Sequence, residues 1–267
     1  MCRVCLLFAA LPPYAVGYQT KSAEFQSTAS EKFTMMAIPF RGIENEYVPV
    51  DDLKFTNIVP GGDQIGECDY IQIWNGTDLL SYYVYADDGE WYSDDGLRLL
   101  KEDFENGIIV GTPFWFVSYT KGTRPEGEVA PTFTVSGAVK PEGFRTYTPE
   151  YISTASEKFT MLSNPFPVAW LPGSEENGAV FTNLVPGGDQ IGECDYIQVW
   201  NGSDLLSYYV YADDGEWYSD DGLRFLSEDF ENGIPAGTPF WFVAWTKTAR
   251  ENEGGPTVTF YNPIAKK

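Results

Sequence analysis

One long unit occurs twice in this chain, and that repeat constrains the fold more than any other feature. Residues 17 to 140 recur at 143 to 266, and from Phe55 to Lys121 only nine of 67 positions differ from Phe181 to Lys247. A unit of this length is close to the usual size of a single domain, about 100 to 150 residues, and can bury its own core. The repeat therefore predicts two globular domains in tandem, residues 17–140 and 141–267, rather than a solenoid.

Short runs of strand-forming residues, separated by turn residues, fill each copy. Asp69–Trp74 alternates aliphatic with polar or aromatic side chains, Asn75-Gly76 follows, and Leu79–Ala86 is again rich in strand formers. Asn-Gly is the preferred dipeptide of a type I′ turn, in which both residues have positive φ, so these runs predict a β-hairpin. Only Leu97–Phe104 has a weak helical pattern. Further strands are expected at 33–40, 114–120 and 132–135. We expect an all-β fold, with each copy a small antiparallel β-sandwich or partly open barrel.

Differences between the copies indicate where the unit tolerates change. Residues 37–54 match the second copy at only two of 18 positions, and 122–130 is one residue longer than its counterpart. Both stretches are predicted to be surface loops on a fixed scaffold. Ile109-Val110 becomes Pro235-Ala236 in the second copy, which indicates a turn or a strand edge because proline lacks a backbone donor.

The charge of the chain excludes some classes of partner. It has 39 acidic and 17 basic residues, a net charge of −22. A surface of this sign repels phosphate backbones and anionic lipids, so neither nucleic acid nor a membrane surface is an expected partner. The aromatic content of 16% argues against disorder.

The N-terminus and the cysteines indicate the compartment. Residues 1–16 resemble a signal peptide, with an apolar run and small residues at Ala15-Val16-Gly17. No other run approaches the roughly 18 apolar residues of a membrane span, so we expect a secreted or cell-surface protein. Cys68 and Cys194 occupy the same position in the two copies and cannot pair within one domain. Buried free thiols are the favoured interpretation, and a bond between domains or between chains is the alternative.

The absence of histidine limits catalysis. Without it, Ser-His and Cys-His nucleophiles and histidine-containing zinc sites are excluded. Paired carboxylates of the glycosidase type are the remaining option, but they require a defined separation across a cleft that sequence spacing does not show. We expect no enzymatic activity.

Two Asp-Gly clusters in each copy are candidate calcium sites. Calcium takes six to eight oxygen ligands, and carboxylates on adjacent turns can supply several of them. The spacing is not that of an EF-hand, and solvated turns are the simpler interpretation. The candidate ligands are Asp87, Asp88, Glu90, Asp94, Asp95, Asp213, Asp214, Glu216, Asp220 and Asp221.

Aromatic residues on the expected strands form a candidate sugar-binding platform. Tyr82 and Tyr83 are adjacent in a strand and point to opposite faces, which predicts that they are not both core residues. Packing in the core is the simpler interpretation of the other aromatic residues. The candidate ligand-binding residues are Trp74, Tyr82, Trp91, Trp200, Tyr208 and Trp217.

The order of these motifs resembles that of a known class of repeats. "DYIQIWNG", a tyrosine-rich strand, Trp91 and "GTPFWF" are similar to the β-rich tandem repeats, each about 120 residues and thus of single-domain length, found in uncharacterised secreted or surface proteins of bacteria. The resemblance covers both copies and implies an exported β module with no catalytic residues to carry over.

Three classes of function follow from these observations. The leading hypothesis is a non-enzymatic secreted or cell-surface structural or interaction protein, in which tandem domains provide avidity or self-association. The alternative is a carbohydrate-binding protein that uses exposed Trp and Tyr faces, with calcium as a possible stabiliser. An enzyme ranks last. The partner is thus an unidentified protein or glycan.

Overall fold

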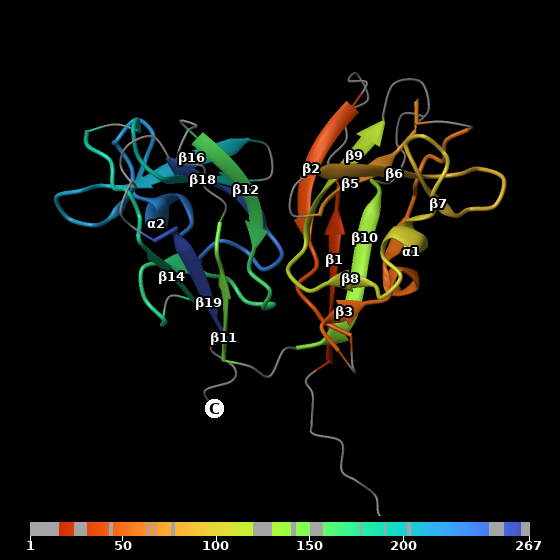
Figure 1. The fold of residues 1–267 in the computed structure, drawn as a ribbon, viewed down its shortest axis with the longest axis horizontal. Helices are drawn as coiled ribbons and strands as arrows, with labels where there is room; N and C mark the ends of the chain where they lie inside the picture. Colours follow the sequence, from red (N-terminus) through yellow and green to blue (C-terminus); the bar gives the residue numbers. More distant parts are fainter. Residues whose placement is uncertain are drawn as a thin grey trace, which may run out of the picture.

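The fold is described from a computed structural model. It covers residues 16–23, 31–42, 45–62, 65–66, 68–75, 78–119, 130–139, 143–149, 157–176, 178–189, 191–201, 204–245 and 254–262. Almost all of the expected leader, residues 1–16, lies outside these ranges, as does nearly all of 122–130. Strands dominate the described residues, which confirms the predicted all-β class (Figure 1).

The first half of the chain contains a five-stranded antiparallel sheet in the order β2-β9-β5-β6-β7 and a three-stranded sheet in the order β1-β10-β4. A short pair, β3-β8, and the one-turn helix α1 complete it. The bounds are β1 Val16–Ser22, β2 Glu31–Ala37, β3 Tyr47–Val48, η1 Val50–Asp52, β4 Lys54–Thr56, β5 Tyr70–Trp74, β6 Leu79–Val84, β7 Trp91–Ser93, α1 Leu100–Asp103, β8 Ile108–Ile109, β9 Pro113–Tyr119 and β10 Thr132–Ala138.

The second half repeats this plan. Its five-stranded sheet has the order β12-β18-β15-β16-β17, and a four-stranded sheet has the order β11-β19-β14-β13. Every sheet of the described residues takes its strands from one half only, and the two halves form separate lobes (Figure 1). The bounds are β11 Phe144–Tyr147, β12 Glu157–Ser163, β13 Leu171–Pro172, β14 Gly178–Thr182, β15 Tyr196–Trp200, β16 Leu205–Val210, β17 Trp217–Ser219, α2 Leu226–Asp229, β18 Pro239–Trp245 and β19 Thr257–Tyr261.

The main core of each half joins the two sheets. Ile71 and Ile73 of β5 are buried with Phe114 and Phe116 of β9, and Phe133 of β10 belongs to the same cluster. Ile71 and Ile73 alternate along β5 with less buried neighbours, as a strand with one face on a core requires. Alternation in the sequence therefore correctly identified the inner face of β5.

Residues 37–54 are not merely a surface loop, which corrects the expectation from the sequence. Ile38, Phe40, Val48 and Leu53 are buried in the first core. In the second half, the corresponding region contributes Trp170 to its core. The two copies diverge here because different side chains fill the same space beside a shared scaffold.

The outer face of the five-stranded sheet is also covered near β6. Tyr82 and Tyr83 are 0% and 1% exposed, so the prediction that they are not both core residues is wrong. Tyr82 enters the main core, whereas the ring of Tyr83 lies on the opposite face, close to Gly61 and the Cys68 thiol. The loop before β5 covers that face, and strand alternation alone does not reveal such a cover.

The predicted hairpin is confirmed, because β5 and β6 pair antiparallel with Trp74 opposite Leu79. Its turn differs from the expected one, since Asn75 does not adopt positive φ. Instead, the Asn75 backbone N–H donates to the carbonyl of Asp78 (3.0 Å), and the Asn75 side-chain oxygen accepts from the Asp78 N–H (2.8 Å). Asn75 thus flanks the turn, and Gly76 lies outside the described residues.

A buried carboxylate fixes the chain next to β5 and β9. Asp69 is fully buried and accepts hydrogen bonds from the backbone N–H groups of Tyr119 (2.7 Å) and Val59 (2.9 Å). Asp195 makes the equivalent bonds to Trp245 and Val185. These carboxylates therefore connect the covering loop to the sheet in both halves.

No helix among the described residues has the length and apolar character that crossing a membrane requires.

Candidate functional site at the contact between the halves

Four tryptophans on the outer faces of the five-stranded sheets join the two halves. Trp74 of β5 packs against Trp241 of β18 with ring centroids 5.9 Å apart, and Trp115 of β9 packs against Trp200 of β15 at 5.8 Å. In both pairs the rings meet edge to face, which is one of the two arrangements that aromatic pairs prefer. Trp200 and Trp241 are the repeat counterparts of Trp74 and Trp115. The contacts are therefore reciprocal, as in a two-fold interface between identical subunits, although one chain supplies both sides.

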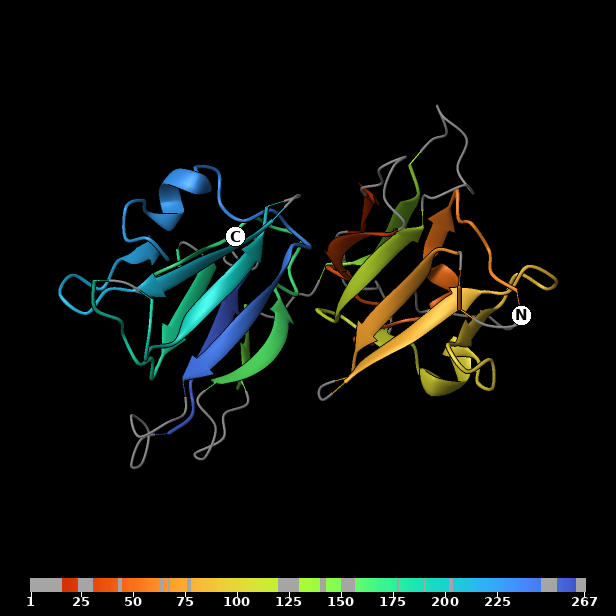
Figure 2. The same cartoon turned by 90° about the horizontal axis from the view of Figure 1, so that it is seen from above.

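Two phenylalanines extend this contact. Phe33 of β2 lies edge-on to Trp115 at 6.1 Å, and Phe159 of β12 lies edge-on to Trp241 at 6.2 Å. Both remain about two-fifths exposed, at 40% and 42%. The contact thus has an aromatic centre with partly exposed aromatic residues beside it. Figure 2 shows the backbone of the two halves from above.

A second set of contacts between the halves does not follow the repeat. The Arg145 guanidinium of β11 donates to the carbonyl oxygen of Val110 (3.3 Å) and lies 3.6 Å from the Glu46 carboxylate. The buried Ser163 hydroxyl donates to the carbonyl oxygen of Gly111 (2.9 Å). Glu46, Val110 and Gly111 belong to the first half, whereas Arg145 and Ser163 belong to the second. We call these five residues the clamp.

Three side chains of the clamp are particular to their own copies. The positions equivalent to Arg145 and Ser163 are Gln19 and Ala37, and the position equivalent to Glu46 is Pro172. None of these three side chains has the group that its counterpart uses in the clamp. The clamp therefore fixes one orientation of an otherwise reciprocal contact.

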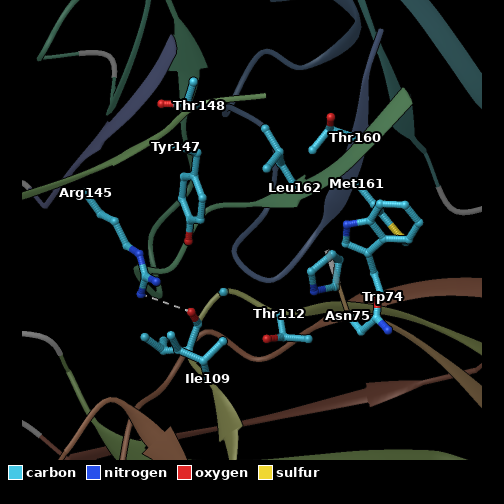
Figure 3. Close-up of a pocket in the computed structure, with 13 residues that line it drawn as sticks. Trp74, Asn75, Ile109, Thr112, Arg145, Tyr147, Thr148, Thr160, Met161 and Leu162 are labelled. Atoms are coloured by element: carbon cyan, nitrogen blue, oxygen red, sulfur yellow. Dashed lines mark hydrogen bonds between the residues drawn. The ribbon is translucent and has the colours of Figure 1, made fainter. Parts of the chain in front are cut away.

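A cavity of about 350 Å³ lies beside the clamp, between the halves (Figure 3). The Tyr147 hydroxyl is buried there with no hydrogen-bond partner. Burial raises the pKa of Tyr147 to about 12, although the nearby Arg145 opposes this shift. Gly111 has φ +85°, and a Cβ at that position would lie 2.4 Å from the Tyr147 oxygen, so a glycine is required. The lining residues are Trp74, Asn75, Ile109, Val110, Gly111, Thr112, Pro113, Arg145, Tyr147, Thr148, Thr160, Met161 and Leu162.

The structure distributes the predicted aromatic site residues over two locations. Trp74 and Trp200 lie in the contact between the halves. Tyr82 and Tyr208 are fully buried, so the prediction that their faces are exposed is wrong. Trp217 is only 8% exposed, which corrects its predicted exposure in the same way.

Trp91 is partly buried and packs on Phe55, with ring centroids 4.9 Å apart. The equivalent pair in the second half, Trp217 and Phe181, is separated by 5.0 Å. These tryptophans pack against the cores of their own halves and do not form a platform together with Trp74 and Trp200.

The predicted calcium ligands accept hydrogen bonds from their own turns. Asp88 accepts from the Tyr92 hydroxyl (3.0 Å) and the backbone N–H of Glu90 (2.9 Å). Asp95 accepts from the Ser93 hydroxyl and the backbone N–H of Leu97. These bonds lower the pKa of Asp95. Within the part of the chain that the structure describes, no three cysteine or carboxylate side chains are placed to hold a metal ion.

The same turns form a surface that occurs once in each half, and we call residues 85–98 and 211–224 the acidic edges. Tyr85 and Tyr92 pack edge to face at 5.8 Å and, with Tyr83 and Gly96, line a hollow of about 220 Å³. Tyr211 and Tyr218 pack in the same way at 5.7 Å. The most exposed large apolar side chains of the described residues lie on these edges, Leu97 at 79% and Leu223 at 81%.

Both predicted free cysteines are confirmed. Cys68 and Cys194 are free and buried. Burial is the largest cause that raises the pKa of each thiol, so both stay protonated and unreactive at neutral pH.

Arg145, Tyr147, Ser163 and Glu46 were not among the sequence-based candidates. The signal that identifies them is divergence between the copies, because each differs from its repeat counterpart. In the sequence such differences predict loops, whereas in the structure these four residues lie at the contact between the halves.

Comparison with models of protein families, with curated proteins and with solved structures found no match. The function must therefore be argued from the geometry of the chain.

Proposed function

We propose that this chain is a non-enzymatic secreted or cell-surface structural or interaction protein, built from two tandem β-sandwich units. The observation that supports this function best is the repetition of the acidic edge. Each half carries the same paired tyrosines, the same exposed leucine and the same carboxylates. The tryptophan pairs and the clamp hold these two surfaces in one relative orientation.

Two linked copies of one surface are suited to bivalent binding. Once the first edge is bound, the second edge meets its target at a high effective concentration, which raises avidity by about 10²- to 10⁴-fold without new contacts. A fixed orientation improves this gain because less conformational freedom is lost on binding. The partner would be a surface with repeated epitopes, such as a polymeric protein or a cell envelope.

The residues at the edges support a binding role rather than a catalytic one. The chain has no histidine, and Asp88 and Asp95 already accept hydrogen bonds from turn N–H and hydroxyl groups. Export is supported by the signal-like residues 1–16 and by the net charge of −22.

The test is a binding assay with one or both edges altered. Labelled full-length protein is applied to arrays of immobilised glycans, matrix proteins and envelope proteins. The variants are Tyr85→Ala with Tyr92→Ala, Tyr211→Ala with Tyr218→Ala, and all four substitutions together. Phe144→Ala is the control, because Phe144 is 62% exposed and lies outside both edges.

Retention on protein spots is expected for the wild type and the control. Each two-residue variant should lose at least tenfold in apparent affinity, and the four-residue variant should not be retained. Equal retention of all variants would rule out the edges as the binding surfaces.

Carbohydrate binding is the second candidate, and the hollow beside Tyr85 and Tyr92 favours it. Aromatic rings next to carboxylates can contact the C–H face and the hydroxyl groups of a sugar. Retention on glycan spots alone, with the same loss in the variants, would favour this candidate over protein binding.

A further inference from the structure

The cavity between the halves is a place where the two copies have become different. Arg145 and Tyr147 face it from the second half, and the equivalent residues in the first half are Gln19 and Lys21. Ile109 and Val110 line it from the first half and correspond to Pro235 and Ala236. The repeat therefore cannot build the same cavity twice, so any site there is present once per chain.

The lining combines an apolar wall with polar groups. Trp74, Ile109, Pro113 and Leu162 supply the apolar side chains. The polar groups come from Arg145, Tyr147 and three threonines (Figure 3). A volume of about 350 Å³ is at the lower end of the range for small-molecule sites, about 300 to 1,000 Å³.

The Tyr147 hydroxyl is the group that most directly indicates a ligand. Its oxygen is buried without a hydrogen-bond partner, and a buried donor without a partner is unfavourable. Gly111 leaves room for the hydroxyl, because a Cβ at that position would lie 2.4 Å from the Tyr147 oxygen. A ligand oxygen would satisfy the donor.

The charges around the cavity favour a neutral ligand. Glu46 lies 3.6 Å from the Arg145 guanidinium, which also donates to the carbonyl oxygen of Val110. The positive charge of Arg145 is thus already compensated, and the net charge of −22 repels anions.

We infer that this cavity binds one neutral, hydroxyl-bearing ring of the size of a single sugar residue. Tyr147 donates a hydrogen bond to a ligand hydroxyl oxygen, the threonines exchange hydrogen bonds with other hydroxyls, and the apolar wall contacts the C–H face of the ring. This site is separate from the acidic edges and does not depend on their function.

The experiment uses full-length protein with D-glucose, D-galactose, D-mannose, D-xylose and N-acetylglucosamine as probes. Saturation-transfer NMR detects binding, and calorimetry gives affinity and stoichiometry. Tyr147→Phe removes only the hydroxyl. Arg145→Gln with Tyr147→Lys installs the residues of the other half. Tyr70→Phe is the control for loss of a tyrosine hydroxyl, because Tyr70 donates to Glu31 and lies outside the cavity and both acidic edges.

At least one sugar should bind with one site per chain. Tyr147→Phe should weaken that sugar about tenfold, the double variant should abolish binding, and the control should bind as the wild type does. Unchanged melting temperatures would show that the variants are folded. Two outcomes would overturn the inference: none of the five sugars binds, or a sugar binds equally well to wild type and Tyr147→Phe.

Discussion

Single buried polar groups contribute strongly to the stability of each half. The Asp69 carboxylate accepts hydrogen bonds from two backbone N–H groups, those of Val59 and Tyr119, and Asp195 accepts the equivalent pair in the second half. The bond to Tyr119 is buried and the bond to Val59 is partly buried, so removing the carboxylate leaves both donors without this acceptor and costs free energy.

Asp69→Ala should therefore lower the free energy of unfolding by about 2 to 4 kcal/mol, because two donors at about 1 to 3 kcal/mol each lose their acceptor. Urea denaturation at pH 7 measures this loss. Asp78→Ala, at an exposed position, is the control and should change stability by less than about 0.5 kcal/mol. Equal effects of the two substitutions would contradict the structural role of Asp69.

Three tyrosines with buried hydroxyl groups predict that the folded protein loses stability at alkaline pH, because their surroundings disfavour the charged phenolate. Burial is the largest cause that raises the pKa of Tyr82, Tyr208 and Tyr147, the last to about 12. An unfolded tyrosine ionises at about 10, so the folded state binds these protons more tightly. Their contribution is fully present below about pH 10 and is lost as the pH rises towards the folded pKa, near 12 for Tyr147.

Denaturation at pH 8, 9, 10 and 11 should thus show a constant free energy of unfolding up to about pH 10 and a decline above it. Tyr147→Phe should make the decline shallower. A stability that stays constant to pH 11 would show that these tyrosines ionise normally in the folded protein.

At the scale of elements, the sequence identified the strands and the hairpin because period-two alternation and turn residues are local signals. It did not show that Tyr83 is covered, because the cover is a loop that folds back over the outer face. The sequence also placed residues 37–54 at the surface. Divergence between the copies does not distinguish an exposed loop from a segment that fills the core with different side chains in each copy. The sequence also did not show the contact between the halves, because Trp74 and Trp241 are far apart in the chain and no local pattern connects them.

The covering loop provides a matched pair of substitutions. A Cβ at Gly61 would lie 2.7 Å from the Tyr83 ring and 2.9 Å from the Cys68 sulfur, whereas at neighbouring Gly62 nothing lies within 4 Å. Gly61→Ala should destabilise the protein by about 1 to 3 kcal/mol through overpacking, and Gly62→Ala should change stability little. Thermal unfolding of the two variants compares them directly, and a smaller loss for Gly61 than for Gly62 would refute this packing.

The acidic turns provide the test of calcium. Their carboxylates accept hydrogen bonds from turn N–H and hydroxyl groups, so we expect the melting temperature to be equal in calcium chloride and in EDTA. Magnesium chloride at the same ionic strength is the control. A rise of several degrees that is specific to calcium would restore the metal hypothesis.

At the scale of the whole molecule, the repeat explains why the halves meet as they do. Identical tryptophans on equivalent strands make a face that is complementary to itself, so the two copies can pack reciprocally. Divergence at the clamp then distinguishes the two sides of the contact. The repeat in the sequence predicted two units, but it did not predict their relative placement, which depends on the shared tryptophans together with clamp side chains that the copies do not share.

Small-angle X-ray scattering of the full chain tests this placement most directly. The comparison is between wild type and a variant with Trp74→Ala, Trp115→Ala, Trp200→Ala and Trp241→Ala, which removes both reciprocal pairs. We predict that one closed arrangement fits the wild-type curve and that the variant has a larger radius of gyration while each half remains folded. A wild-type curve that requires separated halves, or a variant with an unchanged curve, would contradict the account.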